Sequence, residues 1–158
     1  MDKNQSRRDF TEPSVPFPRG DRDYPLRHLA CLQAAAGEDK RVAISGYDPV
    51  AYFTDGHPVK GSSAFSSTFD DALYYFASAE HQKIFAADPD RYAPHYSGYC
   101  AIGVSFGMKL EADPEAWAIS DNRLYVFQNR QGIAVFAKNS AGIIAEADAN
   151  WPSLKDRN

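Results

Sequence analysis

The stretch that decides the fold is GYDPVAYF, residues 46–53. Glycine and the Asp-Pro pair favour a turn here. Asp48 can cap a helix with its side-chain oxygen, and proline suits the first helical position after such a cap. The alternating residues 41–45 before it predict a strand. We therefore predict a strand, a turn and a short helix whose residues 51–53 pack inward.

Two later patterns predict β-hairpins, because apolar and aromatic runs flank a pair of turn-forming residues. The predicted strands are residues 64–69 and 73–77 around Asp70-Asp71, and residues 116–119 and 123–127 around Asp121-Asn122.

Helical patterns complete the chain. Ser78 is placed to cap a helix over residues 79–87, which Asp88-Pro89 would end. Residues 96–106 fit a helix or a strand equally well, and residues 134–151 carry apolar side chains at helical spacing up to Trp151-Pro152. The pattern shows no internal repeat. The predicted fold class is α+β, a small antiparallel sheet built from hairpins with several short helices.

The length and composition of the chain exclude several classes of protein. The chain has 158 residues, 44% hydrophobic and 24% charged, with a net charge of −4. This length favours one domain. No apolar run reaches the roughly 18 residues of a membrane span, and two cysteines exclude a disulfide-rich scaffold. Without a basic cluster, a nucleic-acid partner is not expected.

The N-terminal part has a different composition. Residues 1–24 are charged and rich in proline, which predicts an extended or disordered arm, and residues 25–40 predict a helix. Residues 6–10 read S-R-R-D-F, which resembles a twin-arginine export signal, but no apolar core follows. The chain as given therefore predicts a cytoplasmic protein, with the periplasm as the alternative.

Several short motifs together resemble the YHS-domain family, and they span residues 41–153. In chain order they are GYDPVAYF at 46–53, P-V-x-G at 58–61, YFAS at 75–78, Phe85, Asp88-Pro89, YAP at 92–94, GYCA at 98–101 and NWP at 150–152. The nearest subgroup is the small stand-alone bacterial members, many of them exported. The resemblance implies a core related to the treble-clef-like TRASH domains, which sense or carry transition metals through cysteines.

The metal-binding relatives carry three cysteines that this chain replaces. Their positions fall at Ala51, Ala77 and His81, so His81 alone keeps a ligand type. A cysteine-rich zinc site is therefore not expected from the resemblance.

Three residues are the candidate metal ligands: Cys100, His81 and His95. A thiolate is a soft ligand, and Cys100 has small neighbours that would let a partner approach. His81 lies in the first turn of a predicted helix, where neutral imidazole is favoured. His95 precedes Cys100 by five residues and could share its metal. The alternatives are that Cys100 is a buried cysteine, that His81 is an exposed histidine on the helix surface, and that His95 is a solvated loop histidine.

Two further residues have supporting roles. Asp48 caps a helix or orients a histidine that binds the metal, and Tyr96 is a structural or hydrogen-bonding aromatic. A Cys31–Cys100 disulfide is possible in an oxidising compartment.

The leading hypothesis is a protein that binds or handles a transition metal, copper first and zinc second, and it assigns no catalytic residue. The alternatives are a thiol-based redox protein that uses Cys100 and a non-catalytic module that docks a protein partner. The surroundings of the Cys100 sulfur discriminate among them, since full apolar burial favours the docking module.

Overall fold

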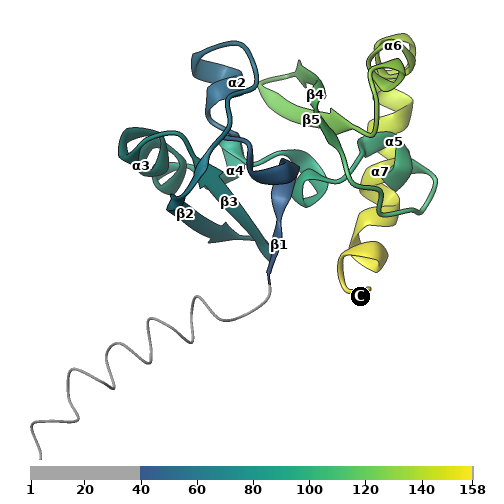
Figure 1. Ribbon diagram of the computed structural model, residues 1–158. Coiled ribbons are helices and arrows are strands. Elements are labelled where there is room, and N and C mark those ends of the chain that lie inside the picture. Colours follow the sequence, from purple (N-terminus) through teal and green to yellow (C-terminus); the bar gives the residue numbers. More distant parts are fainter. Residues whose placement is uncertain (1–39, 158) are drawn as a thin grey trace, which may run out of the picture. The chain divides into compact units, whose positions relative to one another are not determined.

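The computed structural model describes residues 40–157, which form an α+β fold of short strands and helices (Figure 1). The predicted arm and nearly all of the predicted N-terminal helix lie outside this range, as do Cys31 and residues 6–10. No helix among the described residues is long and apolar enough to cross a membrane.

The first strand is shorter than predicted. β1 covers only Arg41–Val42, and the η1 turn Ala43–Gly46 follows at once. Ile44, Ser45 and Gly46 have φ values of 46°, 52° and 81°, a left-handed run that a strand cannot contain. The prediction of a strand to residue 45 is therefore wrong, because alternation in the sequence does not report the sign of φ.

Both predicted hairpins are confirmed. The first comprises β2 (Ser62–Phe69) and β3 (Ala72–Phe76), and the second comprises β4 (Asp113–Ser120) and β5 (Arg123–Phe127). β1 adds to the first pair in parallel, giving the order β1-β3-β2. The turn residues Asp70-Asp71 and Asp121-Asn122 all have positive φ, as tight hairpin turns require.

The helices are short except for the last. They are α2 (Ala51–Thr54), α3 (Ala79–Ala87), α4 (Pro89–Tyr92), the η2 turn (His95–Gly98), α5 (Ala101–Ser105), α6 (Gln131–Lys138) and α7 (Ser140–Lys155). The predicted α3 boundaries and its Ser78 cap are confirmed. The ambiguous stretch 96–106 is the η2 turn followed by α5.

The C-terminal prediction needs correction. Two helices replace the single predicted one, because Asn139 adopts φ −150° and ψ 51° and ends α6. α7 also continues past Pro152, and buried Leu154 holds its last turn against the core.

The chain contains an internal repeat, so the prediction that it has none is wrong. Residues 43–92, the first repeat, and residues 95–155, the second repeat, follow the same path at an offset of 51–52 residues. The hairpins share their register: Ser62 pairs with Phe76 and Ser66 with Tyr75, while Asp113 pairs with Phe127 and Trp117 with Val126. Each register contains the same bulge, at an offset of 51 residues.

The backbone outside the hairpins also has the same conformation in the two repeats. The second left-handed run, Tyr96-Ser97-Gly98, has φ values of 58°, 53° and 77°. The amide of Asp48 donates to the Val59 carbonyl, and the amide of Cys100 donates to the Leu110 carbonyl, each at 2.8 Å. Positive φ outside glycine is uncommon, so two runs at this offset mark a duplicated unit.

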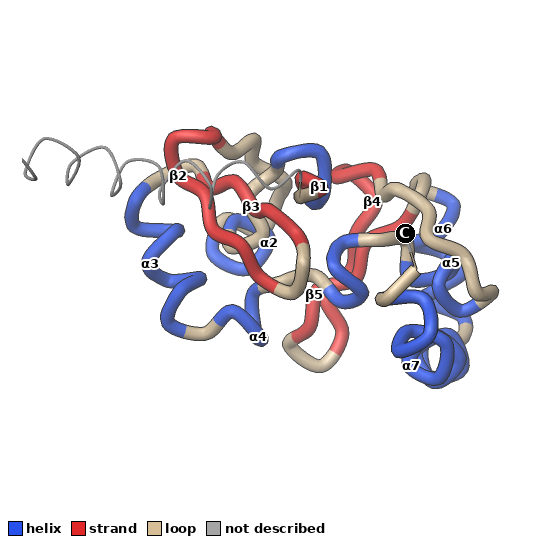
Figure 2. The backbone as a smooth tube through the Cα atoms, turned by 90° about the horizontal axis from the view of Figure 1, so that it is seen from below, coloured by secondary structure: helices blue, strands red, loops and turns tan. Residues whose placement is uncertain are grey.

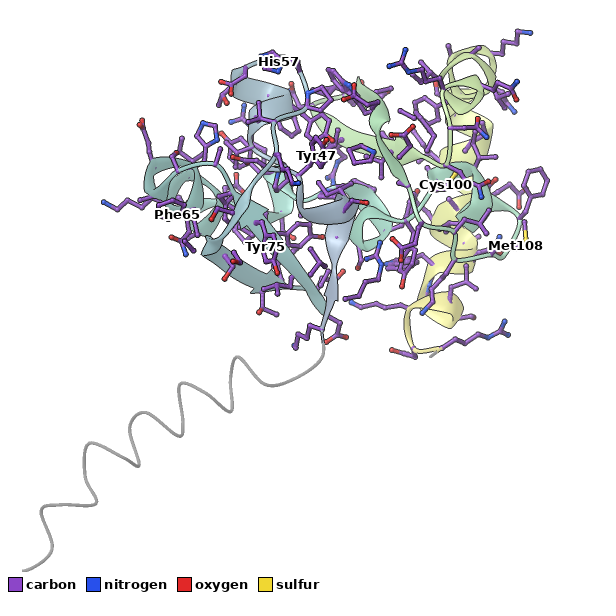
Figure 3. The ribbon with its side chains drawn as sticks, in the orientation of Figure 1. Tyr47, His57, Phe65, Tyr75, Cys100 and Met108 are labelled. Atoms are coloured by element: carbon purple, nitrogen blue, oxygen red, sulfur yellow. The ribbon has the colours of Figure 1, made fainter. Side chains whose placement is uncertain are left out.

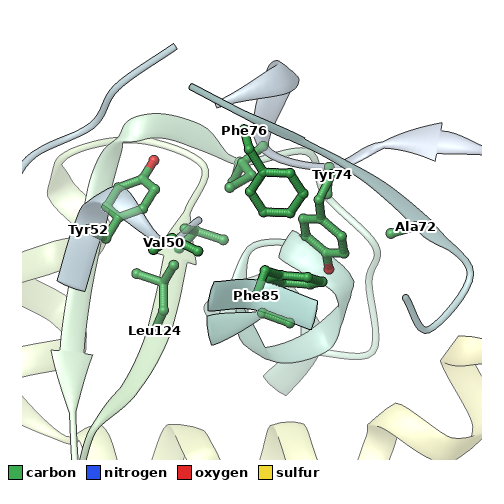
Figure 4. Close-up of a cluster of buried hydrophobic side chains, with 12 residues drawn as sticks. Val50, Tyr52, Ala72, Tyr74, Phe76, Phe85 and Leu124 are labelled. Atoms are coloured by element: carbon green, nitrogen blue, oxygen red, sulfur yellow. The ribbon is translucent and has the colours of Figure 1, made fainter. Parts of the chain in front are cut away.

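Each repeat has its own buried cluster. The first contains Tyr74, Phe76 and Phe85 (Figure 4), and the second contains their counterparts Tyr125, Phe127 and Phe136. Successive side chains of a strand point to opposite faces, and both faces of β5 are buried. Leu124 and Val126 belong to the first cluster, whereas Tyr125 and Phe127 belong to the second. Figure 2 shows α3 and the first hairpin apart from α5 to α7.

Candidate functional site: a histidine–aspartate pair and a sulfur-lined pocket

Asp48 is fully buried and accepts four hydrogen bonds. Its Oδ1 accepts from the amides of Val50 and Ala51 at 2.8 and 3.3 Å. Its Oδ2 accepts from the amide of Ala77 at 2.8 Å and from the His81 ring at 2.6 Å. A buried carboxylate is tolerated only when its lone pairs are filled. Asp48 therefore caps the α2 turn and also orients a histidine, two roles that the sequence left as alternatives.

His81 presents one ring nitrogen outward. A carboxylate only accepts, so Nδ1 carries the hydrogen that Asp48 accepts. Nε2 lies 3.5 Å from the Thr54 hydroxyl, and the side chain is 16% exposed. This carboxylate–imidazole arrangement is the one that orients metal-binding histidines. Among the described residues, however, no group of three or more His, Cys, Asp or Glu side chains is placed to hold one metal ion.

Cys100 lies in the second repeat at the position of Asp48. It is 3% exposed and belongs to the second buried cluster. Its sulfur accepts from the Gly103 amide at 3.5 Å, the counterpart of the bond from the Ala51 amide to Asp48. The thiol is thus a small capping group with little direct access to solvent.

A pocket of about 220 Å³ opens beside Cys100. Met108 also lines it, and these two residues carry both sulfur atoms of the described chain. Figure 3 shows both residues in the second repeat, with Met108 on the loop after α5. The rim is apolar and exposed, since Phe106, Met108 and Val135 are 75%, 47% and 49% exposed. Neither His81 nor His95 lines this pocket.

His95 lies instead in a separate pocket of about 250 Å³, where the two repeats meet. Its Nε2 accepts from the Arg123 guanidinium at 3.0 Å, and its ring stacks on Tyr125. Burial, reinforced by the Arg123 charge, lowers the pKa of His95. The neutral ring therefore fits this place best.

Tyr96 and Tyr74 line the same pocket. The Tyr96 hydroxyl donates to Asp148 at 2.8 Å, and burial together with this bond raises the pKa of Tyr96. The buried Tyr74 hydroxyl has no hydrogen-bond partner among the described residues.

Sequence reasoning missed two features. Met108 was not a candidate, because a lone methionine gives no signal until the fold brings it to a cysteine. Residues 103–107 read G-V-S-F-G, the spacing of a nucleophile elbow. Ser105 ends the short α5 helix and donates to the Ile102 carbonyl at 2.6 Å. It therefore does not lie on the strand-to-helix turn that this chemistry requires.

The comparison with protein families agrees with the fold and the motifs. The model of the YHS domain, a type of domain associated with metal handling, matches residues 50–96. The chain therefore contains a YHS domain over residues 50–96. The match covers most of the first repeat and ends at Tyr96, near the start of the second. No curated protein and no solved structure matches this chain.

Proposed function

We propose that this YHS-domain protein handles copper, and that it binds Cu(I) in the pocket beside Cys100. The observation that carries the proposal is that the thiol of Cys100 and the thioether of Met108 line one pocket. Thiolate and thioether sulfur are soft ligands, and soft ligands select Cu(I) over harder ions. The apolar rim would keep water from the ion.

Zinc fits this donor set less well. Protein zinc sites use three or four sulfur, nitrogen or carboxylate ligands, and the described residues bring no such group together. The candidate ligands His81 and His95 each have another partner, Asp48 and Arg123. The proposed copper ligands are therefore Cys100 and Met108, and neither histidine is assigned to the ion.

The experiment is a Cu(I) titration against a chromophoric chelator under reducing conditions. Cys100→Ser is expected to abolish stoichiometric binding. Met108→Leu, a change on a half-exposed side chain, should weaken binding by at least about tenfold, or 1.4 kcal/mol. Cys31→Ser is the matched control and should retain the affinity of the parent chain. Equal affinity in the Cys100→Ser variant would refute the proposal.

The thiol-redox alternative makes a different prediction. A nucleophilic thiolate needs access to its substrate, and Cys100 is 3% exposed. We therefore expect Cys100 to be alkylated far more slowly in the folded chain than in urea. Alkylation at the same rate in both states would favour the redox protein over the copper site.

A further inference from the structure

Three acidic side chains line the pocket of about 250 Å³ where the two repeats meet. Asp70, Asp90 and Asp148 contribute the carboxylates, and Arg123 is the one residue with a permanent positive charge among the described residues of the lining. The Arg123 guanidinium donates to the His95 ring, which is neutral and adds no charge of its own. With three negative groups against one positive group, the pocket favours a cation over an anion.

Two of these carboxylates have capacity for a further donor. Asp90 and Asp148 form no ion pair with a basic side chain in the described part of the chain. Asp148 accepts from the Tyr96 hydroxyl at 2.8 Å, but an ionised carboxylate can accept about four hydrogen bonds. Asp70 differs from them, because it is already paired with Lys155. A positively charged N–H donor would therefore find unfilled acceptors in this pocket.

An unpaired hydroxyl is a second, independent sign of a ligand. Tyr74 lines the same pocket, and its buried hydroxyl has no hydrogen-bond partner among the described residues. Buried polar groups are nearly always paired, since an unpaired one loses its bonds to water without replacement. A donor bound in the pocket would supply the bond that the Tyr74 oxygen lacks.

Aromatic rings form much of the remaining wall. Phe69, Tyr96 and Trp151 line the pocket together with Tyr74, and the Tyr96 and Trp151 rings meet edge to face with centroids 5.7 Å apart. Aromatic faces attract organic cations, and they also cover the apolar part of a ligand. The volume of about 250 Å³ is below the roughly 300–1,000 Å³ of pockets for drug-sized ligands, so the occupant is small.

We propose that the pocket between the two repeats binds a small organic ammonium ion, a protonated primary amine attached to an apolar group. The ammonium group would have Asp148 as its main charged partner and would donate one N–H to the Tyr74 hydroxyl. The apolar group would lie against Trp151. This pocket shares no residue with the one beside Cys100, so the inference stands apart from the copper proposal.

The experiment is an NMR titration of the full chain at pH 7 with benzylammonium, which is protonated at this pH as a lysine side chain is. Benzyl alcohol is the neutral analogue and benzoate the negatively charged one. We expect saturable shifts of the amides of Asp70, Ser97 and Trp151 with benzylammonium. The two analogues should bind at least about tenfold more weakly, a difference of 1.4 kcal/mol, because neither carries the positive charge that the carboxylates require.

Two variants test the assigned partners. Asp148→Asn keeps the shape of the side chain without its charge and should weaken benzylammonium binding at least about tenfold, or 1.4 kcal/mol. Glu146→Gln is the matched control and should bind as the parent chain does, since it removes the same charge from the same helix, α7, outside the pocket. Tyr74→Phe should weaken binding about fivefold, or about 1 kcal/mol. It should also raise the urea-unfolding midpoint of the ligand-free chain, because the unpaired hydroxyl is gone.

Asp90→Asn replaces Asp148→Asn if that variant does not fold. Saturable, cation-selective shifts that weaken in the carboxamide variant and in Tyr74→Phe, but not in Glu146→Gln, support the inference. Absence of saturable shifts, equal affinity for benzyl alcohol or benzoate, or unchanged affinity in a folded pocket variant would overturn it. Failure of Cu(I) to bind would leave these results unaffected.

Discussion

The imidazole of His81 donates to the buried carboxylate of Asp48 across 2.6 Å. The same carboxylate accepts from the amides of Val50 and Ala77, so it joins the α2 turn, the end of β3 and the first turn of α3. The α2 turn lies about 30 residues before the other two segments, and one side chain fixes its position against them. The second repeat has no such link among the described residues, because the sulfur of Cys100 accepts only from the local Gly103 amide.

We predict that Asp48→Ala destabilises the fold by about 3 kcal/mol or more, because several buried N–H groups lose their acceptor and each such loss costs about 1–3 kcal/mol. Urea unfolding measures the effect. Asp88→Ala is the control, since Asp88 accepts one exposed bond from Arg91 at 3.3 Å and a cap of this kind is worth about 1 kcal/mol. Equal losses in the two variants would contradict the role given to Asp48.

We predict that His81→Gly loses about 2 kcal/mol of stability, through the missing bond to Asp48 and the helix cost of glycine. Added imidazole should restore part of this loss, because it can fill the vacated space beside the carboxylate. Thermal unfolding with and without imidazole measures the rescue, after subtraction of any effect on the parent chain. Lys83 is exposed on the same helix and provides the control. The stability that Lys83→Gly loses should not be restored by imidazole.

His95 should make the stability depend on pH. Its pKa in the folded chain is lowered from the ordinary 6.5 by burial and by Arg123, so the unfolded chain binds the proton more tightly. Stability is then fully present above pH 6.5 and falls as the pH drops below this value towards the folded pKa. His95→Gln should flatten the urea-unfolding profile in this range. A profile as steep as that of the parent chain would exclude His95 as its source.

The two repeats should unfold together, because β5 supplies side chains to both buried clusters. The two tryptophans provide one probe for each cluster, since Trp117 packs on the first and Trp151 on the second. Trp151→Phe leaves a reporter for the first cluster, and Trp117→Phe leaves one for the second. Within each variant, we expect the fluorescence and circular-dichroism transitions to coincide. Separated transitions would show that the repeats fold independently.

Local sequence patterns predicted the hairpins and α3 well, because those elements depend on neighbouring residues. Asp70-Asp71 and Asp121-Asn122 mark the turns, and Ser78 caps α3 as expected. The left-handed runs at Ile44 and Tyr96 were not predicted, since most residues avoid positive φ and only the surrounding packing holds them there. The repeat was also missed, although the sequence carries a short signal for it: S-G-Y at residues 45–47 recurs at 97–99, and L-Y-x-F at residues 73–76 recurs at 124–127.

The sequence by itself determined the α+β class and the resemblance to the YHS domain, and it marked Asp48 as either a helix cap or the partner of a histidine. Those depend on short-range spacing and on residue types that few local structures accept. Only the tertiary structure decided which candidates meet. It paired His81 with Asp48 and His95 with Arg123, and it brought Cys100 and Met108 to one pocket. Side-chain proximity of this kind depends on how the hairpins and helices pack, which no pattern along the chain encodes.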